Sequence, residues 1–203
     1  MSTNQNANDL RTRNALSSIK TPVRLGLEVS DLSDMCDLLA HLRLVDSPDF
    51  RWNKILPLKV NINTWRIIHK RVPTRSNLDY RWIDLDSVRC PICDDEIESE
   101  EHIFVMCNVV REAWKNIMLW WKINNTFVNN LNDAINLEDR VSLPTKLLKV
   151  FDVVVQITLW FLWKFRNNVV FSSKRPCEEL IFNDIKLYSF VWISNRLKKS
   201  SMN

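Results

Sequence analysis

Glycine is almost absent from this chain of 203 residues, which contains Gly26 and no other glycine. Tight β-hairpins need residues with positive φ, and glycine takes that conformation at the least cost. The scarcity of glycine therefore argues against a sheet rich in hairpins. It favours helices joined by turns of Asn, Asp, Ser and Pro, and we predict a mostly α fold.

Long apolar runs are also missing. The densest one, VFDVVVQITLWFLW, has 14 residues and includes Asp152 and Gln156, whereas a membrane-spanning helix needs about 20 apolar residues. We expect a buried core helix there and no membrane partner. The polar opening MSTNQNANDLRTRN does not resemble a secretory signal peptide. We therefore expect an intracellular protein, nuclear or cytoplasmic.

Charge of one sign is not in large excess, because the net charge is only +4. That value is too small to argue for nucleic acid by itself. The distribution is more informative. A basic block, residues 51–81, has eight basic residues and one acid, and an acidic block, residues 84–101, has eight acids and one base. We expect the acidic block to face water or the neighbouring basic block.

Apolar residues recur at helical spacing in several segments. Helices are expected at 31–44, 58–72, 75–82, 109–122, 131–137, 146–171 and 176–198. In the second of these segments, the expected core-facing residues are Leu58, Ile62, Trp65, Ile68 and Val72. The polar side is expected to carry Lys59, Asn63, Arg66 and Lys70. The two C-terminal helices are expected to be long and buried.

Several residues are typical of helix starts. Thr74 and Asn108 are expected to cap the helices at 75–82 and 109–122, and Ser99 is expected to start a helical turn. Pro176, Glu178 and Glu179 are expected in the first turn of the last helix, where proline fits and acids face the positive end.

Tryptophan is unusually common, with nine in the chain. We expect these indoles to form a large aromatic core, because aromatic side chains bury much apolar area. The alternative is a surface on which nucleic-acid bases stack.

Four possible metal ligands lie within 18 residues, in the pattern C-x2-C-x8-H-x4-C: Cys90, Cys93, His102 and Cys107. Three thiolates and one imidazole suit tetrahedral Zn²⁺. The odd number of cysteines, five, and their uneven clustering favour a metal over disulfides. Four protein ligands fill the coordination shell, so we predict one structural zinc in a CCHC knuckle and no catalytic metal. The alternative is a loop with incidental thiols and a surface histidine.

Nucleic acid is expected at the basic residues and not at the metal, because three thiolates and an acidic loop repel a polyanion. The candidate surface, here called the basic stripe, consists of Lys59, Arg66, Lys70, Arg71 and Arg75. Its partner would be RNA or DNA. The alternative interpretation of the basic stripe is a solvated helix face.

Two segments carry motifs of a known family: LPLKVNINTWRIIHKRVPTRSNL, and DSVRCPICDDEIESEEHIFVMCNVVREAW. They resemble the reverse transcriptase zinc-binding domain, found downstream of the polymerase in plant LINE-type (non-LTR) retrotransposon proteins. The matching residues are Pro57, Lys59, Val60, Trp65, Pro73, Thr74, Leu78, Cys90, Pro91, Cys93, Glu101, His102, Phe104, Cys107 and Trp114. The resemblance covers about residues 50–122. It implies zinc at the CCHC residues and a role in handling template RNA or target DNA.

The resemblance also suggests a division of the chain. We expect a disordered or degraded segment at 1–30, a short linker helix at 31–49 and the zinc-binding domain at 50–122. A loop at 123–145 and a C-terminal helical hairpin at 146–203, packing on the core, follow.

Polymerase chemistry needs paired carboxylates that hold two metal ions. The only Asp-Asp pair, Asp94 and Asp95, lies in the zinc loop. We therefore expect no enzyme activity and no small-molecule substrate for the free chain, although the parent family is RNA-directed DNA polymerase. We expect an accessory domain that binds RNA or DNA, with a reverse transcriptase polymerase domain as a further candidate partner. The alternatives are a zinc-stabilised protein-interaction module or an inert retroelement relic.

Overall fold

Helices make up the regular structure of residues 52–124 and 126–200, the parts that the computed structural model describes. Side chains of residues 196–200 are outside this description. Within these parts there is no β-strand, and the only extended pairing is one antiparallel bridge between Arg89 and Ile97. The mostly α prediction is confirmed. The helix expected at 31–44 lies outside the described residues.

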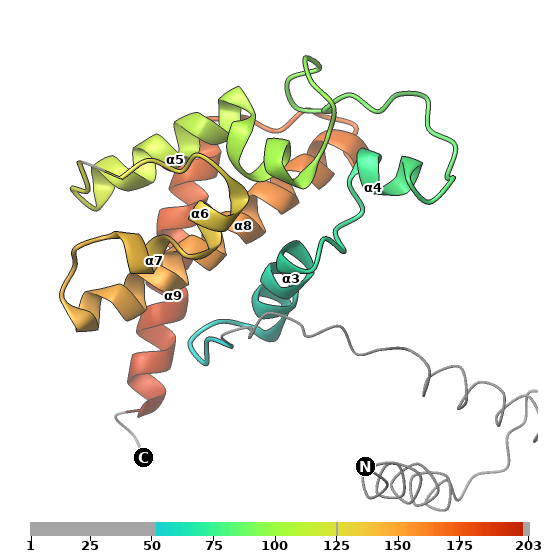
Figure 1. Cartoon of the computed structure of the whole chain (residues 1–203). Helices are drawn as coiled ribbons and strands as arrows, with labels where there is room; N and C mark the ends of the chain where they lie inside the picture. Colours follow the sequence, from blue (N-terminus) through green and yellow to red (C-terminus); the bar gives the residue numbers. More distant parts are fainter. Residues whose placement is uncertain (1–51, 125, 201–203) are drawn as a thin grey trace, which may run out of the picture. The chain divides into compact units, whose positions relative to one another are not determined.

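Helix α8 (Thr145–Phe171) runs through the centre of the described fold (Figure 1). It contacts helix α3 (Leu58–Ile68), helix α9 (Leu180–Ser200) and the π-helical turn η1 (His102–Met106). Every residue from 151 to 159 is buried. A helix that is covered on all sides is apolar all round, which explains the dense apolar run. None of the described helices has the length and apolar character that a membrane crossing requires.

Four shorter helices complete the described part. Helix α4 (Arg75–Asp79) follows α3, and α5 (Asn108–Trp120) packs against η1 and α9. The short helices α6 (Leu131–Ile135) and α7 (Leu137–Arg140) pack against α8. Thr74 caps α4 as expected, because its hydroxyl accepts a hydrogen bond from the N–H of Asn77 at 3.3 Å.

Helix α9 begins four residues later than its sequence predicts. Pro176 and the acids Glu178 and Glu179 precede the helix instead of forming its first turn. Glu178 accepts a hydrogen bond from Arg175 at 3.1 Å, so its carboxylate is paired with Arg175. Within residues 180–195, the buried side chains of α9 lie on one face: Ile181, Ile185 and Ser189.

Helix α3 turns a different side to the core from the one that its apolar spacing predicts. Val60 and Ile67 are fully buried, and Asn63, assigned to the polar side, is only 5% exposed. Leu58 is 65% exposed and Ile62 is 37% exposed, although both were expected in the core. The predicted orientation of this helix is therefore wrong.

A buried polar network explains the orientation of α3. The carboxylate of Asp152 on α8 accepts hydrogen bonds from the side-chain amides of Asn53 at 2.8 Å and Gln156 at 3.1 Å. The side chain of Asn61 accepts from the N–H of Asn53 at 2.8 Å. A buried carboxylate is stable only with such partners. The network holds the Asn61 side of α3 against α8 and leaves Leu58 facing outward.

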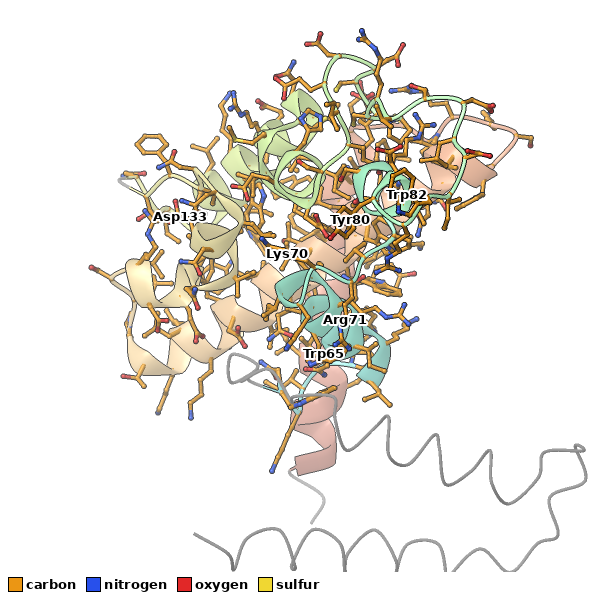
Figure 2. The ribbon with its side chains drawn as sticks, turned by 45° about the vertical axis from the view of Figure 1, so that its right-hand side comes forward. Trp65, Lys70, Arg71, Tyr80, Trp82 and Asp133 are labelled. Carbon is orange, nitrogen blue, oxygen red and sulfur yellow. The ribbon has the colours of Figure 1, made fainter. Side chains whose placement is uncertain are left out.

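Three helical segments end at a residue with positive φ that is not glycine: Lys70, Trp82 and Lys122, with φ of 51°, 59° and 55°. Lys70 and Trp82 are labelled in Figure 2. At Trp82 the following N–H, of Ile83, donates to the carbonyl of Leu78 at 3.1 Å. This is a Schellman closure, in which glycine is usual. The left-handed conformation costs an ordinary residue about 1–2 kcal/mol, so the scarcity of glycine reduces stability at three helix ends.

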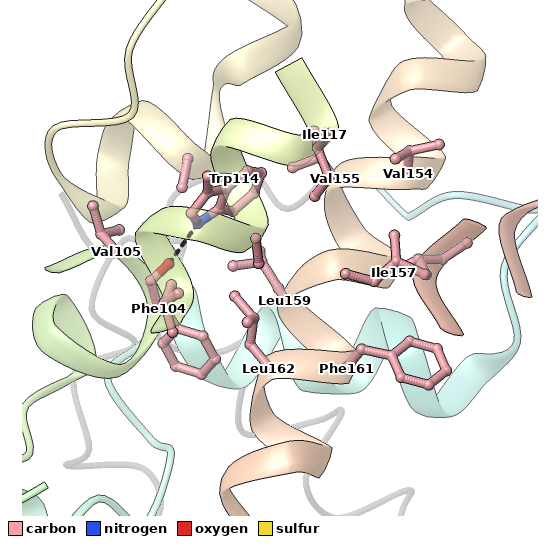
Figure 3. Packing of buried hydrophobic residues seen from close by; sticks show 14 of the residues in the cluster. Phe104, Val105, Trp114, Ile117, Val154, Val155, Ile157, Leu159, Phe161 and Leu162 are labelled. Atoms are coloured by element: carbon pink, nitrogen blue, oxygen red, sulfur yellow. Dashed lines mark hydrogen bonds between the residues drawn. The ribbon is translucent and has the colours of Figure 1, made fainter. Parts of the chain in front are cut away.

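The nine tryptophans do not share one core. Trp114 alone is fully buried, and its indole N–H donates to the carbonyl of Phe104 at 2.8 Å (Figure 3). Several others are half-buried at the edge of the core: Trp121, Trp160, Trp163 and Trp192. Trp82 is 95% exposed. The prediction of a large aromatic core is therefore correct for Trp114 and wrong for Trp82.

Candidate metal centre and basic surface

The structure brings together the four predicted ligands, Cys90, Cys93, His102 and Cys107. Their ligand atoms all lie within 4.8 Å of one another. Cys90 and Cys107 are completely buried, His102 is 5% exposed, and Cys93 is half-buried. The outer two, Cys90 and Cys107, are 17 positions apart in the sequence, and the fold gathers all four residues into one compact cluster.

A tight loop positions the first two ligands. The N–H of Cys90 donates to the carbonyl of Glu96 at 2.7 Å, and the N–H of Asp94 donates to the carbonyl of Cys90 at 2.8 Å. Asp94 has a φ of 56°, the left-handed conformation that Asp tolerates better than most residues. This turn folds the chain back, so that Cys93 lies beside Cys90.

The other two ligands lie at the ends of the π-helical turn. The N–H of Cys107 donates to the carbonyl of His102 at 2.8 Å, which is the five-residue spacing of a π-turn. Ser99 starts this turn as expected, because its hydroxyl accepts from the N–H of His102 at 3.1 Å. Asn108 is not a cap, contrary to prediction. It is the first residue of α5, and Cys107 occupies the cap position.

A carboxylate outside the cluster orients the histidine. Nδ1 of His102 lies 3.2 Å from Oε2 of Glu96, and Nε2 lies 3.3 Å from Sγ of Cys93. When Nδ1 carries the proton and donates it to Glu96, the Nε2 lone pair is directed to the cluster, as metal-binding histidines require. Sequence reasoning missed Glu96, since it is one of several acids in the same loop.

The thiols of Cys90 and Cys107 are coupled. A hydrogen bond from Cys107 lowers the pKa of Cys90 from 9.0 to about 5, although burial opposes the shift. The same hydrogen bond, together with burial, raises the pKa of Cys107. One thiolate therefore forms readily beside one retained proton. A bound cation would displace that proton, because zinc binds cysteine as thiolate.

The donor set fits zinc. Zinc holds sulfur at about 2.3 Å and histidine nitrogen at about 2.0–2.1 Å, which places tetrahedral ligand atoms roughly 3.3–3.8 Å apart. Small side-chain rotations would bring the cluster from its present spacing to that geometry. Four protein ligands complete a closed, structural coordination shell. The residues therefore fit one structural zinc, which would cross-link the loop to the π-helical turn.

The acidic block is not uniformly exposed. Glu98 is completely buried, and it accepts hydrogen bonds from Nε of Arg166 at 2.5 Å, from Nη2 of Arg166 at 2.8 Å and from the N–H of Arg75 at 2.9 Å. Glu100 is also buried and accepts a hydrogen bond from Asn77. These two residues do not face water, because each has partners that replace its hydration. They face the neighbouring basic block, the other expected position, since Glu98 contacts Arg75 and Glu100 contacts Asn77.

Four residues of the basic stripe are exposed: Lys59, Arg66, Lys70 and Arg71. Among residues 52–124 and 126–200, none of these four side chains forms an ion pair. The guanidinium of Arg71 lies 4.9 Å from the ring centre of Trp65, and the amine of Lys59 lies 5.5 Å from that of Trp160. These contacts support the long side chains without neutralising them.

Arg75 differs from the other stripe residues because it is tied into the fold. Its guanidinium donates to the carbonyl of Arg89 at 2.6 Å and lies 4.0 Å from the carboxylate of Glu98. Arg75 and Arg66 line a crevice of about 470 Å³ together with Trp163 and other residues of α8. The basic stripe thus ends at a hollow that two of its arginines line together with Arg166 and Asp86.

Fold and site together define a helical zinc-binding domain. Residues 37–114 match the family model described as zinc-binding in reverse transcriptase. This segment carries the whole CCHC cluster and the basic stripe, so this part of the chain is similar to the zinc-binding domain of reverse transcriptases. No curated protein and no solved structure gives a significant match to the chain.

Proposed function

We propose that this domain binds RNA or DNA through the basic stripe, as an accessory part of a reverse-transcriptase-related protein. The supporting observation is the set of four exposed cations that no acid neutralises among the described residues. Cations left free of ion pairs can release the counterions of a phosphate backbone, which is the main source of affinity in such complexes. The crevice between Arg66 and Arg75 extends the same surface inward.

Zinc acts indirectly in this proposal. The metal would hold the loop that carries Glu98, and Glu98 binds both the backbone of Arg75 and the side chain of Arg166. Through these contacts the loop keeps α4 beside α8 and maintains the crevice. Loss of zinc is therefore expected to weaken nucleic-acid binding by deforming the surface, without removing a phosphate contact.

We infer a role in binding and not in catalysis. The Asp94-Asp95 pair lies in the zinc loop, where both residues are exposed. It therefore lacks the setting of polymerase carboxylates. The motif resemblance supports a plant non-LTR retroelement as the origin, a polymerase domain as a partner, and a nuclear or cytoplasmic location.

The experiment is a titration of labelled RNA and single-stranded DNA with the zinc-loaded chain over a series of salt concentrations. The parent is expected to lose affinity steeply as salt rises, with a slope of about 0.7 for each phosphate neutralised. The double variant Lys59→Glu with Arg66→Glu is expected to lose most of that affinity while keeping its helicity and zinc content.

A matched control variant changes the net charge by the same amount as the stripe variant. Lys146 and Lys149 are exposed lysines near the start of α8, away from the stripe in the sequence. The variant Lys146→Glu with Lys149→Glu should retain more affinity than the stripe variant. Equal losses in the two double variants would show a response to net charge alone and would contradict a specific stripe.

A second candidate function, protein docking, has its own support. A largely apolar groove of about 650 Å³ lies beside α5 and includes Met106, Met118, Leu119 and Phe127. Leu119 is 61% exposed and Phe127 is 71% exposed. If the zinc-loaded parent binds neither RNA nor DNA, this groove becomes the better candidate for the functional surface.

A further inference from the structure

Two aromatic side chains project from the turn after α4. Tyr80 is 86% exposed and Trp82 is 95% exposed, and Figure 2 shows both beside this helix. Large aromatic residues normally bury most of their surface in a core or an interface. Neither ring does so in the described fold.

Trp82 also occupies an unfavourable backbone conformation. A bulky residue with positive φ is an outlier, and the closing position of a Schellman motif usually belongs to glycine. Lys122 has the same backbone conformation at the end of α5, but it is a charged residue that suits solvent. Trp82 has both the unfavourable positive φ and an exposed indole ring. It therefore contributes little to stability, and its side chain is available to a ligand.

Hydrogen bonds fix the backbone that carries the two rings. The N–H of Tyr80 donates to the carbonyl of Ser76 at 3.0 Å, and the N–H of Trp82 donates to that of Asp79 at 2.9 Å. Tyr80, Trp82 and Leu85 line a hollow of about 690 Å³. Leu85 also lines the crevice of Arg66 and Arg75, so the aromatic hollow adjoins the crevice.

The charges of this hollow restrict what can occupy it. Asp79 and Asp84 line it, and both are exposed. They would repel a phosphate placed between them, whereas the flat face of a base carries no charge. A strand with its phosphates on the basic stripe and its unpaired bases at Tyr80 and Trp82 would satisfy both surfaces. A duplex cannot do so, because its bases are already stacked and paired.

We propose that Tyr80 and Trp82 form a stacking platform for unpaired bases, and that single-stranded RNA or DNA is the preferred ligand. This inference rests on the proposed nucleic-acid binding and adds its substrate class. Stacking on an aromatic side chain tolerates any base, so affinity should depend little on sequence. A protein partner for the same rings is the competing possibility, and the test below separates the two.

The main test compares Trp82→Gly with the parent on a single-stranded oligonucleotide and on its duplex. Loss of the ring should reduce single-strand affinity about tenfold, with little change for duplex and no change in the salt slope. The same substitution relieves the backbone, so the melting temperature should rise by about 2–4 °C. Tyr80→Ala should also reduce single-strand affinity.

Two control variants separate the backbone effect of Trp82→Gly from the loss of its ring. Lys122→Gly relieves the same backbone conformation and should raise the melting temperature without altering affinity. Phe190 is 72% exposed on α9, and Phe190→Ala removes an exposed ring elsewhere. It should leave affinity unchanged. A loss of affinity in either control equal to that of Trp82→Gly would overturn the platform.

An abasic strand, which keeps the sugar and phosphates, isolates the contribution of the bases. The parent should bind it at least as weakly as Trp82→Gly binds the normal strand, and the double variant Trp82→Gly with Tyr80→Ala should not distinguish the two strands. Undiminished binding of the normal strand by Trp82→Gly would refute base stacking and favour a protein partner. If the stripe variant still loses affinity in that case, the proposed function stands. Absence of salt-dependent binding by the parent refutes both.

Discussion

The acidic block and the basic block are neighbours in the sequence, and the fold uses them differently. In the acidic block, Glu98 is buried against Arg166, and Glu96 contacts His102 of the metal cluster. In the basic block, Arg66 and Lys70 are exposed and have no ion pair within the described residues. Arg75 is the point where the two blocks meet.

The comparison shows that like-charged residues close together in the sequence can have two roles. They can be buried as part of the fold, or they can stay exposed and available to bind a ligand. A carboxylate accepts several hydrogen bonds, so a buried one can join segments that are distant in the sequence. The basic side chains of α3, Lys59 and Arg66, instead stay exposed, and each has no ion pair within the described residues although it lies near α8. Substitutions in the acidic block should therefore change folding, and those in the basic block should change binding.

The largest effect is expected from removing the metal. Cys93→Ser should reduce zinc from one per chain to none and should destabilise the fold by more than about 5 kcal/mol, because structural zinc contributes roughly 10–16 kcal/mol in small zinc peptides. Metal analysis and thermal melting measure these changes. Cys177→Ser is the control, since Cys177 is exposed and outside the cluster. An identical melting temperature for metal-stripped and zinc-loaded protein would contradict the structural role.

The next effect concerns the buried ion pair. Glu98→Gln should destabilise the fold by about 3–5 kcal/mol, because it leaves Arg166 buried without its counter-charge. Urea unfolding measures the change, and Arg166→Met in the Glu98→Gln background should recover part of it. Glu112→Gln, which breaks an exposed pair with Lys115, should cost at most about 1 kcal/mol. Similar losses at both sites would remove the distinction between buried and exposed acids.

A smaller effect is expected at the carboxylate that orients the histidine. Glu96→Gln should weaken zinc affinity about 10- to 100-fold, because it disturbs the hydrogen bond to Nδ1 of His102. Competition with a chelator gives the affinity. Asp95→Asn is the matched control, since Asp95 is an exposed neighbour outside the cluster. Equal affinities in the two variants would show that Glu96 does not support the metal.

The smallest effect on stability is expected in the basic block. Lys59→Glu with Arg66→Glu should change the free energy of unfolding by less than about 1 kcal/mol, as for most surface substitutions. Chemical unfolding of the zinc-loaded protein tests this. A loss as large as that of Glu98→Gln would mean that the stripe is part of the fold, and the contrast between the blocks would fail.

Patterns local in the sequence predicted much of this molecule. The spacing of Cys90, Cys93, His102 and Cys107 predicted the cluster, because its residues lie within two adjoining turns. The helical period identified α8 almost to its ends, Thr145 and Phe171. Caps were predicted less well. Thr74 caps α4, but the cap before α5 is Cys107.

Features that depend on distant partners were not predictable in this way. The orientation of α3 follows from a network with Asp152, 99 positions from Asn53. The burial of Glu98 follows from Arg166. Apolar spacing alone suggested that Leu58 faces the core. A single sequence contains no local signal for either long-range contact. Only the structure shows which side of α3 faces the core and that Glu98 is buried.

The distance along the chain between Glu98 and Arg166, 68 residues, also bears on synthesis. The ribosome adds roughly 5–20 residues per second, so about 3–14 seconds separate the emergence of the acid from that of its arginine. During that interval the loop of Glu98 can exist without α8, and its carboxylate must remain hydrated. Early capture of zinc would give the nascent loop a defined form before the long helix arrives to cover it.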